Sequence, residues 1–422
     1  MEKRSAFHDR VSNLVQSYPR QFWLLFAGML ISTLGASMVW PFLMIYVSGK
    51  LKLPLTQVAS LMTLNAGMGL LFSFLAGPVT DRAGRKWVMV VSLGMNALAY
   101  LLMSQANTFS AFAVLMALSG AFNPLYRVGA DAMMADMIPP ERRTDAYALM
   151  RTSNNLGVAV GPAIGGILAS ISYTFAFLAG AAGLAIYAIL VAFFAHETLP
   201  PLAVTAKPPR EKFGGYGRIF RDRPFMGFAV AFTLTQVCAA LIWVLLGVYA
   251  KENYQMPESL YGLIPMTNAL MVVFLQLPVT MLTRRFPALR VLAVGSLFYA
   301  IGVGSVALGQ GFWGFWLSMI ILTFGELMMS PTATAYAANL APANMRGRYM
   351  GIYGMTWGVA AGIGPVIGGY LNDNYGPVTI WYGGFLFGLA SVCGFLLMSR
   401  RYSEPVAPII QPEAGNSDPP IT

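Results

Sequence analysis

Residues 21–49 read QFWLLFAGMLISTLGASMVWPFLMIYVSG, a run without a single charged side chain. A helix needs about 20 apolar residues to cross the hydrocarbon core of a bilayer, and this run is longer than that. The polar segment before it lacks the short apolar core and the small-residue cleavage site of a secretion signal. We therefore expect the run to remain in the mature chain as a membrane-spanning helix.

The composition of the whole chain agrees with this reading. The 422 residues are 57% hydrophobic and 10% charged, whereas a soluble domain carries roughly 25% charged residues. The net charge is +10, but the basic residues stand in short clusters between long uncharged runs and do not alternate with aromatic residues. This placement argues against nucleic-acid binding. The two cysteines, Cys238 and Cys393, lie inside apolar runs and offer neither a disulfide framework nor metal-ligand spacing.

Further apolar runs after residues 21–49 bring the number of predicted spans to twelve. Two long runs, 87–126 and 152–195, are each divided by a polar break, near 104–108 and near 170–172. The other predicted spans are 21–49, 53–80, 224–250, 259–283, 289–308, 312–340, 349–372 and 377–399. We expect an N-terminal segment (1–20), a six-helix half (21–196), a Pro-rich basic linker (197–223), a second six-helix half (224–400) and a disordered tail (401–422). The predicted fold class is all-α integral membrane.

The positions of the basic residues predict the topology. Both termini, the central linker and the even-numbered loops share one side of the membrane in this arrangement, and that side carries 23 of the 27 Lys and Arg residues. Basic residues are enriched in cytoplasmic loops. We expect both termini to be cytoplasmic and the chain to lie in a cell inner membrane.

An internal repeat relates the two halves. With a shift of 203 residues, the sequence ADMIP at 135–139 lies over ANLAP at 338–342, and GPAIGG at 161–166 lies over GPVIGG at 364–369. The register holds without a gap over about 35 residues. Parallel six-helix halves are one of the repeat plans of transporters, and the substrate then binds at the midplane between them.

The loop between the second and third spans reads GPVTDRAGRK at residues 77–86. It resembles the cytoplasmic signature of the major facilitator superfamily, G-x-x-x-D-R-x-G-R-K, and it falls in the loop where that family has it. The resemblance implies a latch that holds the outward-facing state. Asp136, at the end of the fourth span, resembles an acid that in this family joins Arg85 and Asp81 in a charge network. The latch residues implied are Gly77, Asp81, Arg82, Gly84, Arg85, Lys86 and Asp136. A basic topogenic loop would explain the Arg and Lys residues alone.

The fifth span contains a second sequence of this kind, GVAVGPAIGG at residues 157–166. It resembles the antiporter signature G-x-x-x-G-P-x-x-G-G of the drug:proton antiporter branch of the same superfamily. The run AHETL at 195–199 also resembles exporters of this branch. Small residues four apart let helices pack closely, and a proline bends a helix. The motif residues are Gly157, Gly161, Pro162, Gly165 and Gly166. The fourth span departs from the family pattern, because Ala117 stands where an Arg is usual.

Three charged residues lie well inside predicted spans: Arg127, Asp131 and Glu326. Such residues are costly in a bilayer and normally face a cavity or a partner. Arg127 and Asp131 are four residues apart on one helix face and could neutralise each other. Glu326 has no basic residue within helical reach, and its GELMMSP context resembles the tenth helix of some bacterial multidrug exporters. We expect proton coupling or substrate contact at these three residues, with Asp131 equally open to a purely structural pairing.

Aromatic and polar residues near the midplane are the candidates for the cavity wall. Aromatic faces suit planar cations. Taken singly, each of these residues is open to a packing or lipid-facing role instead. The candidates are Trp40, Phe42, Tyr46, Tyr126, Gln236, Trp243, Tyr353 and Trp357.

The sequence thus predicts a secondary active transporter that exports lipophilic or cationic compounds in exchange for protons. A proton-coupled carrier of one metabolite, a sugar or an organic anion, is the alternative, since Arg127 suits an anion. A membrane sensor that transports nothing is a third class, which the intact motifs disfavour. No catalytic triad, phosphate-binding loop or metal-ligand cluster is evident in the sequence. We therefore expect no enzyme activity, cofactor or metal, and as partners only small-molecule substrate, protons and the lipid bilayer around a monomer.

Overall fold

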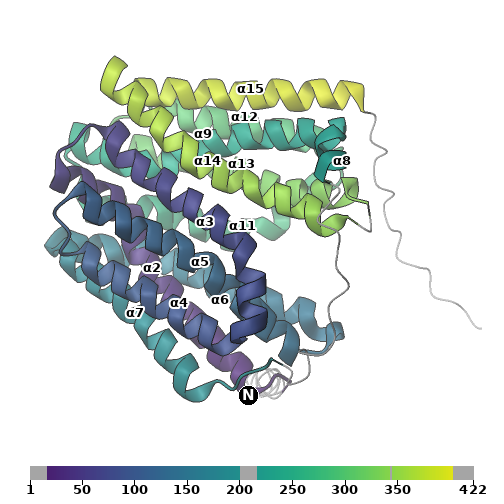
Figure 1. Cartoon of the computed structure of the whole chain (residues 1–422). Helices are drawn as coiled ribbons and strands as arrows, with labels where there is room; N and C mark the ends of the chain where they lie inside the picture. Colours follow the sequence, from purple (N-terminus) through teal and green to yellow (C-terminus); the bar gives the residue numbers. More distant parts are fainter. Residues whose placement is uncertain (1–16, 200–215, 343–344, 403–422) are drawn as a thin grey trace, which may run out of the picture.

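The computed structural model describes residues 17–199, 216–342 and 345–402 (Figure 1). These residues form twelve helical segments that are long and apolar enough to cross a membrane. The spans are α2 (Arg20–Leu51), α3 (Leu55–Ala83), α4 (Arg85–Met103), α5 (Phe109–Met137), α6 (Arg143–Ile171), α7 (Tyr173–Phe194), α9 (Arg223–Tyr254), α10 with α11 (Glu258–Tyr261 and Leu263–Thr283), α12 (Ala288–Ser305), α13 (Gly311–Leu340), α14 (Arg346–Tyr375) and α15 (Thr379–Arg401). Two short helices, η1 (Pro140–Arg142) and α8 (Tyr216–Arg221), complete the set.

The predicted twelve-helix plan is confirmed, with two boundaries clearly displaced. The apolar run that contains the fourth span ends at residue 126, but α5 continues to Met137. The fifth span was expected to begin at residue 152, but α6 begins at Arg143. A charged residue ends an apolar run in the sequence, but it does not end a helix. The helix continues as long as its backbone N–H groups bond to the carbonyl oxygens four residues earlier. The predicted terminal segments lie almost wholly outside the described residues, as does 200–215 of the predicted linker; α8 falls in the rest of that linker.

The repeat extends over the helices of both halves. Helix α2 begins at Arg20 and α9 at Arg223, an offset of 203 residues, and each has 32 residues. Each helix is followed by a residue with a left-handed backbone conformation, Lys52 (φ 50°) after α2 and Gln255 (φ 52°) after α9, again at an offset of 203. The two pseudo-symmetric halves expected from the sequence are therefore present.

The halves meet at one end of the bundle and separate toward the other. We call the end where α2 begins and α15 ends the terminal end, and the other the opposite end. Near the opposite end, a Cβ on Gly369 of α14 would lie 2.7 Å from the Thr56 nitrogen of α3. Near the terminal end, Gly351 and Gly354 of α14 have no described atom within 4 Å of such a Cβ. The space between the halves therefore opens toward the terminal end; Figure 1 shows the two halves as two layers of helices.

Candidate transport site

Three polar residues form an exposed stripe along α5: Asn123, Arg127 and Asp131. Residues four apart share one helix face, and the other side of α5 carries apolar residues such as Leu125 and Ala132. Polar side chains at this depth face a cavity in preference to lipid. We therefore expect the stripe to form the N-terminal wall of the space between the halves.

Arg127 and Asp131 form no ion pair within 4.0 Å in this conformation. Neither of them takes part in the three ion pairs found among the described residues. Tyr147 of α6 donates a hydrogen bond to the backbone oxygen of Asp131 at 3.3 Å, and Asp131 is an exposed residue of α5. An exposed pair gains little from contact, because water screens both charges. Arg127 and Asp131 are thus not in direct contact in this conformation, and a functional role for either stays a prediction.

Glu326, which we expect on the C-terminal wall, accepts a hydrogen bond from an amide that the sequence analysis did not single out. Asn268 of α11 donates from its Nδ2 to Glu326 Oε2 at 2.8 Å and to Thr323 Oγ1 at 2.9 Å. The Thr323 hydroxyl donates to the Met319 carbonyl, so its oxygen is free to accept from Asn268. No basic side chain of the described chain lies within 4.0 Å of Glu326. Asn268 was detectable as an amide inside an apolar span.

The repeat places the two walls at matching depths. The residue that corresponds to Glu326, 203 positions earlier, is Asn123 of the α5 stripe. Arg127 lies one turn from Asn123, about 6 Å along the axis toward the terminal end. Glu326 and Arg127 therefore lie at similar depths in opposite halves of the bundle.

The predicted cavity residues separate into two groups. Trp40 and Trp357 are exposed, and Tyr126 and Trp243 are partly buried. The others are buried: Phe42 packs on Tyr261, Tyr353 packs on Phe228 and Phe232, Tyr46 donates to the Ser104 carbonyl at 2.9 Å, and Gln236 has a carboxamide oxygen without a partner in the described chain. Those four are buried in this conformation, and a role for them in the cavity wall stays a prediction.

Three charged residues of the predicted latch, Arg85, Asp81 and Asp136, form a cluster at the terminal end. Arg85 lies between two carboxylates, with its Nε 3.1 Å from Asp136 and a terminal nitrogen 3.5 Å from Asp81. Asp81 is 70% exposed, so one face of the cluster is open. Arg82 is exposed and Lys86 lies over the Trp87 ring. A Cβ on Gly77 would have no described atom within 4 Å, so no other helix packs closely against Gly77 in this conformation.

Glu197 and Thr198, which follow α7, complete this cluster. The Glu197 carboxylate accepts hydrogen bonds from the first backbone N–H groups of α4, those of Arg85 (3.0 Å) and Lys86 (3.1 Å). The Thr198 hydroxyl donates to Asp136 at 3.0 Å. Gly84, with φ 89°, is in contact with Glu197 at the point where a Cβ would stand, which explains the glycine. Sequence reasoning gave the 195–199 run only a family resemblance and missed this contact.

Replacement of Glu197 by Ala is expected to destabilise the N-terminal half. The change leaves two helix-terminal N–H groups without their acceptor, which costs about 1 kcal/mol. The midpoint of thermal unfolding in detergent should fall by about 2–4 °C. Glu141→Ala, which removes an exposed carboxylate from η1, is the matched control. An equal shift in both variants would show that the cap contributes nothing specific.

The small residues of α6 bring three helices together. Gly157, Gly161 and Gly165 face the backbone of α2 at distances that leave no room for a side chain. Gly166 instead faces the other half, where a Cβ would lie 2.5 Å from the Glu258 carbonyl oxygen. The Pro162 carbonyl stands against Gly262. This segment therefore packs inside its own half and against the other.

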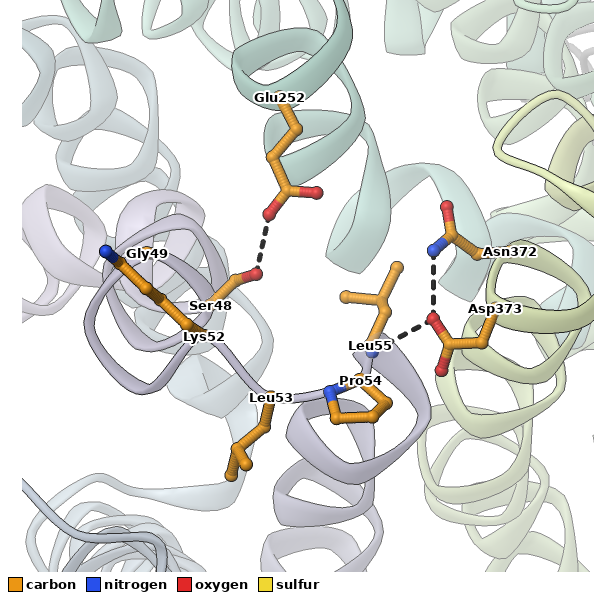
Figure 2. Close-up of a pocket in the computed structure, with 9 residues that line it drawn as sticks. All are labelled: Ser48, Gly49, Lys52, Leu53, Pro54, Leu55, Glu252, Asn372 and Asp373. Carbon is orange, nitrogen blue, oxygen red and sulfur yellow. Dashed lines mark hydrogen bonds between the residues drawn. The ribbon is translucent and has the colours of Figure 1, made fainter.

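Hydrogen bonds between the halves gather at the opposite end, around a pocket of about 370 Å³ (Figure 2). Ser48 of α2 donates to Glu252 of α9 at 2.7 Å, and Tyr173 of α7 donates to Glu258 of α10 at 2.5 Å. Asp373 of α14 accepts from the Leu55 nitrogen of α3 at 3.1 Å. In each case a carboxylate of the C-terminal half accepts from the N-terminal half.

Comparison with known proteins agrees with this architecture. The chain is 27% identical over 380 residues to a Na(+), Li(+), K(+)/H(+) antiporter of Planococcus maritimus. The alignment covers 82% of this chain and 86% of that protein. It is 23% identical to the multidrug resistance protein MdtH of Yersinia pestis, over 90% of this chain and 94% of that one.

Two solved structures share the fold at low sequence identity. The nucleoside transporter NupG matches with a TM-score of 0.75 and 14% identity, over 90% of this chain and 99% of that one. A bacterial homolog of the human lysosomal transporter Spinster, in an inward-facing and occupied conformation, matches with a TM-score of 0.75 and 12% identity, over 90% and 96%. The family model of the Major Facilitator Superfamily matches residues 25–256 and 228–420, and the chain belongs to that superfamily of transporters.

Proposed function

We propose that the protein exports lipophilic cations in exchange for protons, by alternating access of one site between its two halves. Glu326 carries this proposal. Its carboxyl group stands inside a span, bonded to the neutral amide of Asn268 and without a cationic partner in the described chain. Such a group can hold a proton or a substrate cation in turn. Trp357, exposed on α14, offers an aromatic face to the same ligand.

The relatives and the conformation support the same proposal. One relative is named as a cation/proton antiporter and another as a multidrug resistance protein. The separation of the halves at the terminal end is an inward-facing arrangement if the termini are cytoplasmic, as the basic residues predict. We place the protein as a monomer in a cell inner membrane. In this proposal the latch of Arg85, Asp81 and Asp136 holds the outward-facing conformation.

A proton-coupled carrier of an organic anion is the second candidate, and Arg127 favours it. The guanidinium is exposed on the α5 stripe and takes part in none of the ion pairs of the described residues. An arginine of this kind recognises carboxylate or phosphate. The two candidates differ in the charge of the substrate, which makes them separable by one measurement.

Proton release from the detergent-solubilised protein on addition of substrate tests the proposal. A lipophilic cation should release protons from the wild-type protein, because the cation and the proton compete for Glu326. Glu326→Gln should abolish the release, since the amide cannot titrate. Glu141→Gln should leave it unchanged. Release by an organic anion with none by any cation would overturn cation export and favour the second candidate.

A further inference from the structure

We infer that Asp373 is a positioning residue that closes the opposite end of the protein during transport. The inference builds on the alternating access of the proposed function and does not depend on the substrate or on Glu326. Asp373, in the C-terminal half, holds helix α3 of the N-terminal half.

The contact is made at the first turn of α3. Asp373 accepts from the Leu55 nitrogen at 3.1 Å, from the Thr56 nitrogen at 2.8 Å and from the Thr56 hydroxyl at 2.6 Å. The first N–H groups of a helix have no partner within it, and a carboxylate near them is favoured by the helix dipole. These three bonds therefore satisfy groups that α3 cannot satisfy itself.

Helix α3 has no cap of its own. The residue that precedes its first turn is Pro54, and no side chain of the cap position accepts from the helix. When the halves separate at this end, the N–H groups of Leu55 and Thr56 lose Asp373 and must turn to water. The cap is thus supplied only in the conformation with the opposite end closed, and its free energy favours that conformation.

The repeat shows that this device is present on one side only. The counterparts of Asp373 and Thr56, at the offset of 203, are Ser170 and Ser259. The Ser170 hydroxyl donates to the Ile167 carbonyl of its own helix. The glycine contacts of the two sides do correspond, since Gly166 faces the Glu258 carbonyl as Gly369 faces the Thr56 nitrogen. The helix packing is shared by both sides, whereas the carboxylate cap is not.

The surroundings of Asp373 allow its bonds to break and form again. It lines the pocket at the opposite end together with Lys52 and Glu252, so water can reach it (Figure 2). Figure 2 shows Asn372 donating to the same carboxylate, at 3.0 Å, from the adjacent position of α14. Asp373 is therefore aimed by its own helix at α3 and is not locked in an apolar core.

Cysteine labelling of the full-length protein in detergent tests this assignment without substrate. The reporter for the opposite end is Ala59→Cys, because Ala59 is fully buried and lies one turn after Thr56 on the same face of α3. The reporter for the terminal end is Gly351→Cys, which points into open space. The background carries Cys393→Ser to remove the exposed thiol, and Cys238 stays because it is buried.

Asp373→Asn should raise the labelling rate at position 59 about tenfold, equivalent to about 1.4 kcal/mol, and lower the rate at position 351. Thr56→Val should give a smaller change of the same signs, and Asn374→Ala, whose amide bonds within its own helix, should give none. A local loosening of structure would raise the rate at position 59 without lowering it at 351. That result, or unchanged rates in both the Asp373 and Thr56 variants, would overturn the assignment.

Discussion

Proteoliposomes that carry Glu326→Gln are expected to accumulate no substrate against a pH gradient. For each proton exchanged, a gradient of about two pH units supplies about 2.7 kcal/mol and supports about a hundredfold concentration ratio. In the variant the ratio should fall to about one, because the amide cannot carry the proton. Radiolabelled lipophilic cation inside the vesicles, measured at steady state, gives the ratio directly.

Two matched variants separate Glu326 from the other acids. Glu141→Gln changes a carboxyl group that is exposed in η1, and transport should persist. Asp131→Asn removes the carboxyl group that stands one turn from Arg127 on the other wall, and it should reduce the ratio less than Glu326→Gln does. Gradient-driven accumulation that survives in Glu326→Gln but disappears in Asp131→Asn would move the coupled proton to α5.

The twelve spans were predictable because the bilayer imposes a length and a polarity on each of them. The uncharged run of α2 and the polar break between α4 and α5 follow from hydropathy alone. The repeat was visible in the sequence because the two halves pack in the same way and need glycine at the same positions. Gly166 and Gly369, for example, each face backbone of the other half at corresponding places. The start of α6 was misplaced because a helix extends into the aqueous boundary as long as its peptide groups pair.

The contacts that connect distant parts of the chain could not be read from spacing. Glu197 caps α4 from a position 112 residues later than Arg85, and Asp373 caps α3 from a position 318 residues later than Leu55. Each carboxylate stands in a sequence context that resembles an ordinary polar loop. Asn268 belongs to the same class, because its role depends on which residue of α13 it faces.

The polar contacts at the two ends of the bundle differ in which halves they join. At the terminal end, the cluster of Arg85, Asp81 and Asp136 lies within the N-terminal half and leaves Asp81 open to a partner. At the opposite end, carboxylates of the C-terminal half already reach across to the N-terminal half. Separation of the halves at the opposite end would break the bonds there and leave those of the terminal cluster intact.

Gly166→Leu is expected to prevent closure of the opposite end and to reduce transport by tenfold or more. A Cβ on Gly166 would lie 2.5 Å from the Glu258 carbonyl oxygen and 3.2 Å from the carbonyl carbon, so backbone would have to move. Overpacking of this kind costs about 1–3 kcal/mol. The cost falls only on the conformation in which α6 and α10 are in contact, so the protein should shift toward the open form and remain folded.

Transport, labelling and thermal unfolding together check this prediction. Labelling of Ala59→Cys should rise in Gly166→Leu, whereas the unfolding midpoint should stay within a few degrees of wild type. Gly94→Leu is the matched control, because Gly94 of α4 has no described atom within 4 Å of its Cβ position. Wild-type transport by Gly166→Leu would mean that α6 and α10 need not meet during the cycle. Loss of transport without a rise in labelling would place the role of Gly166 elsewhere than in closure.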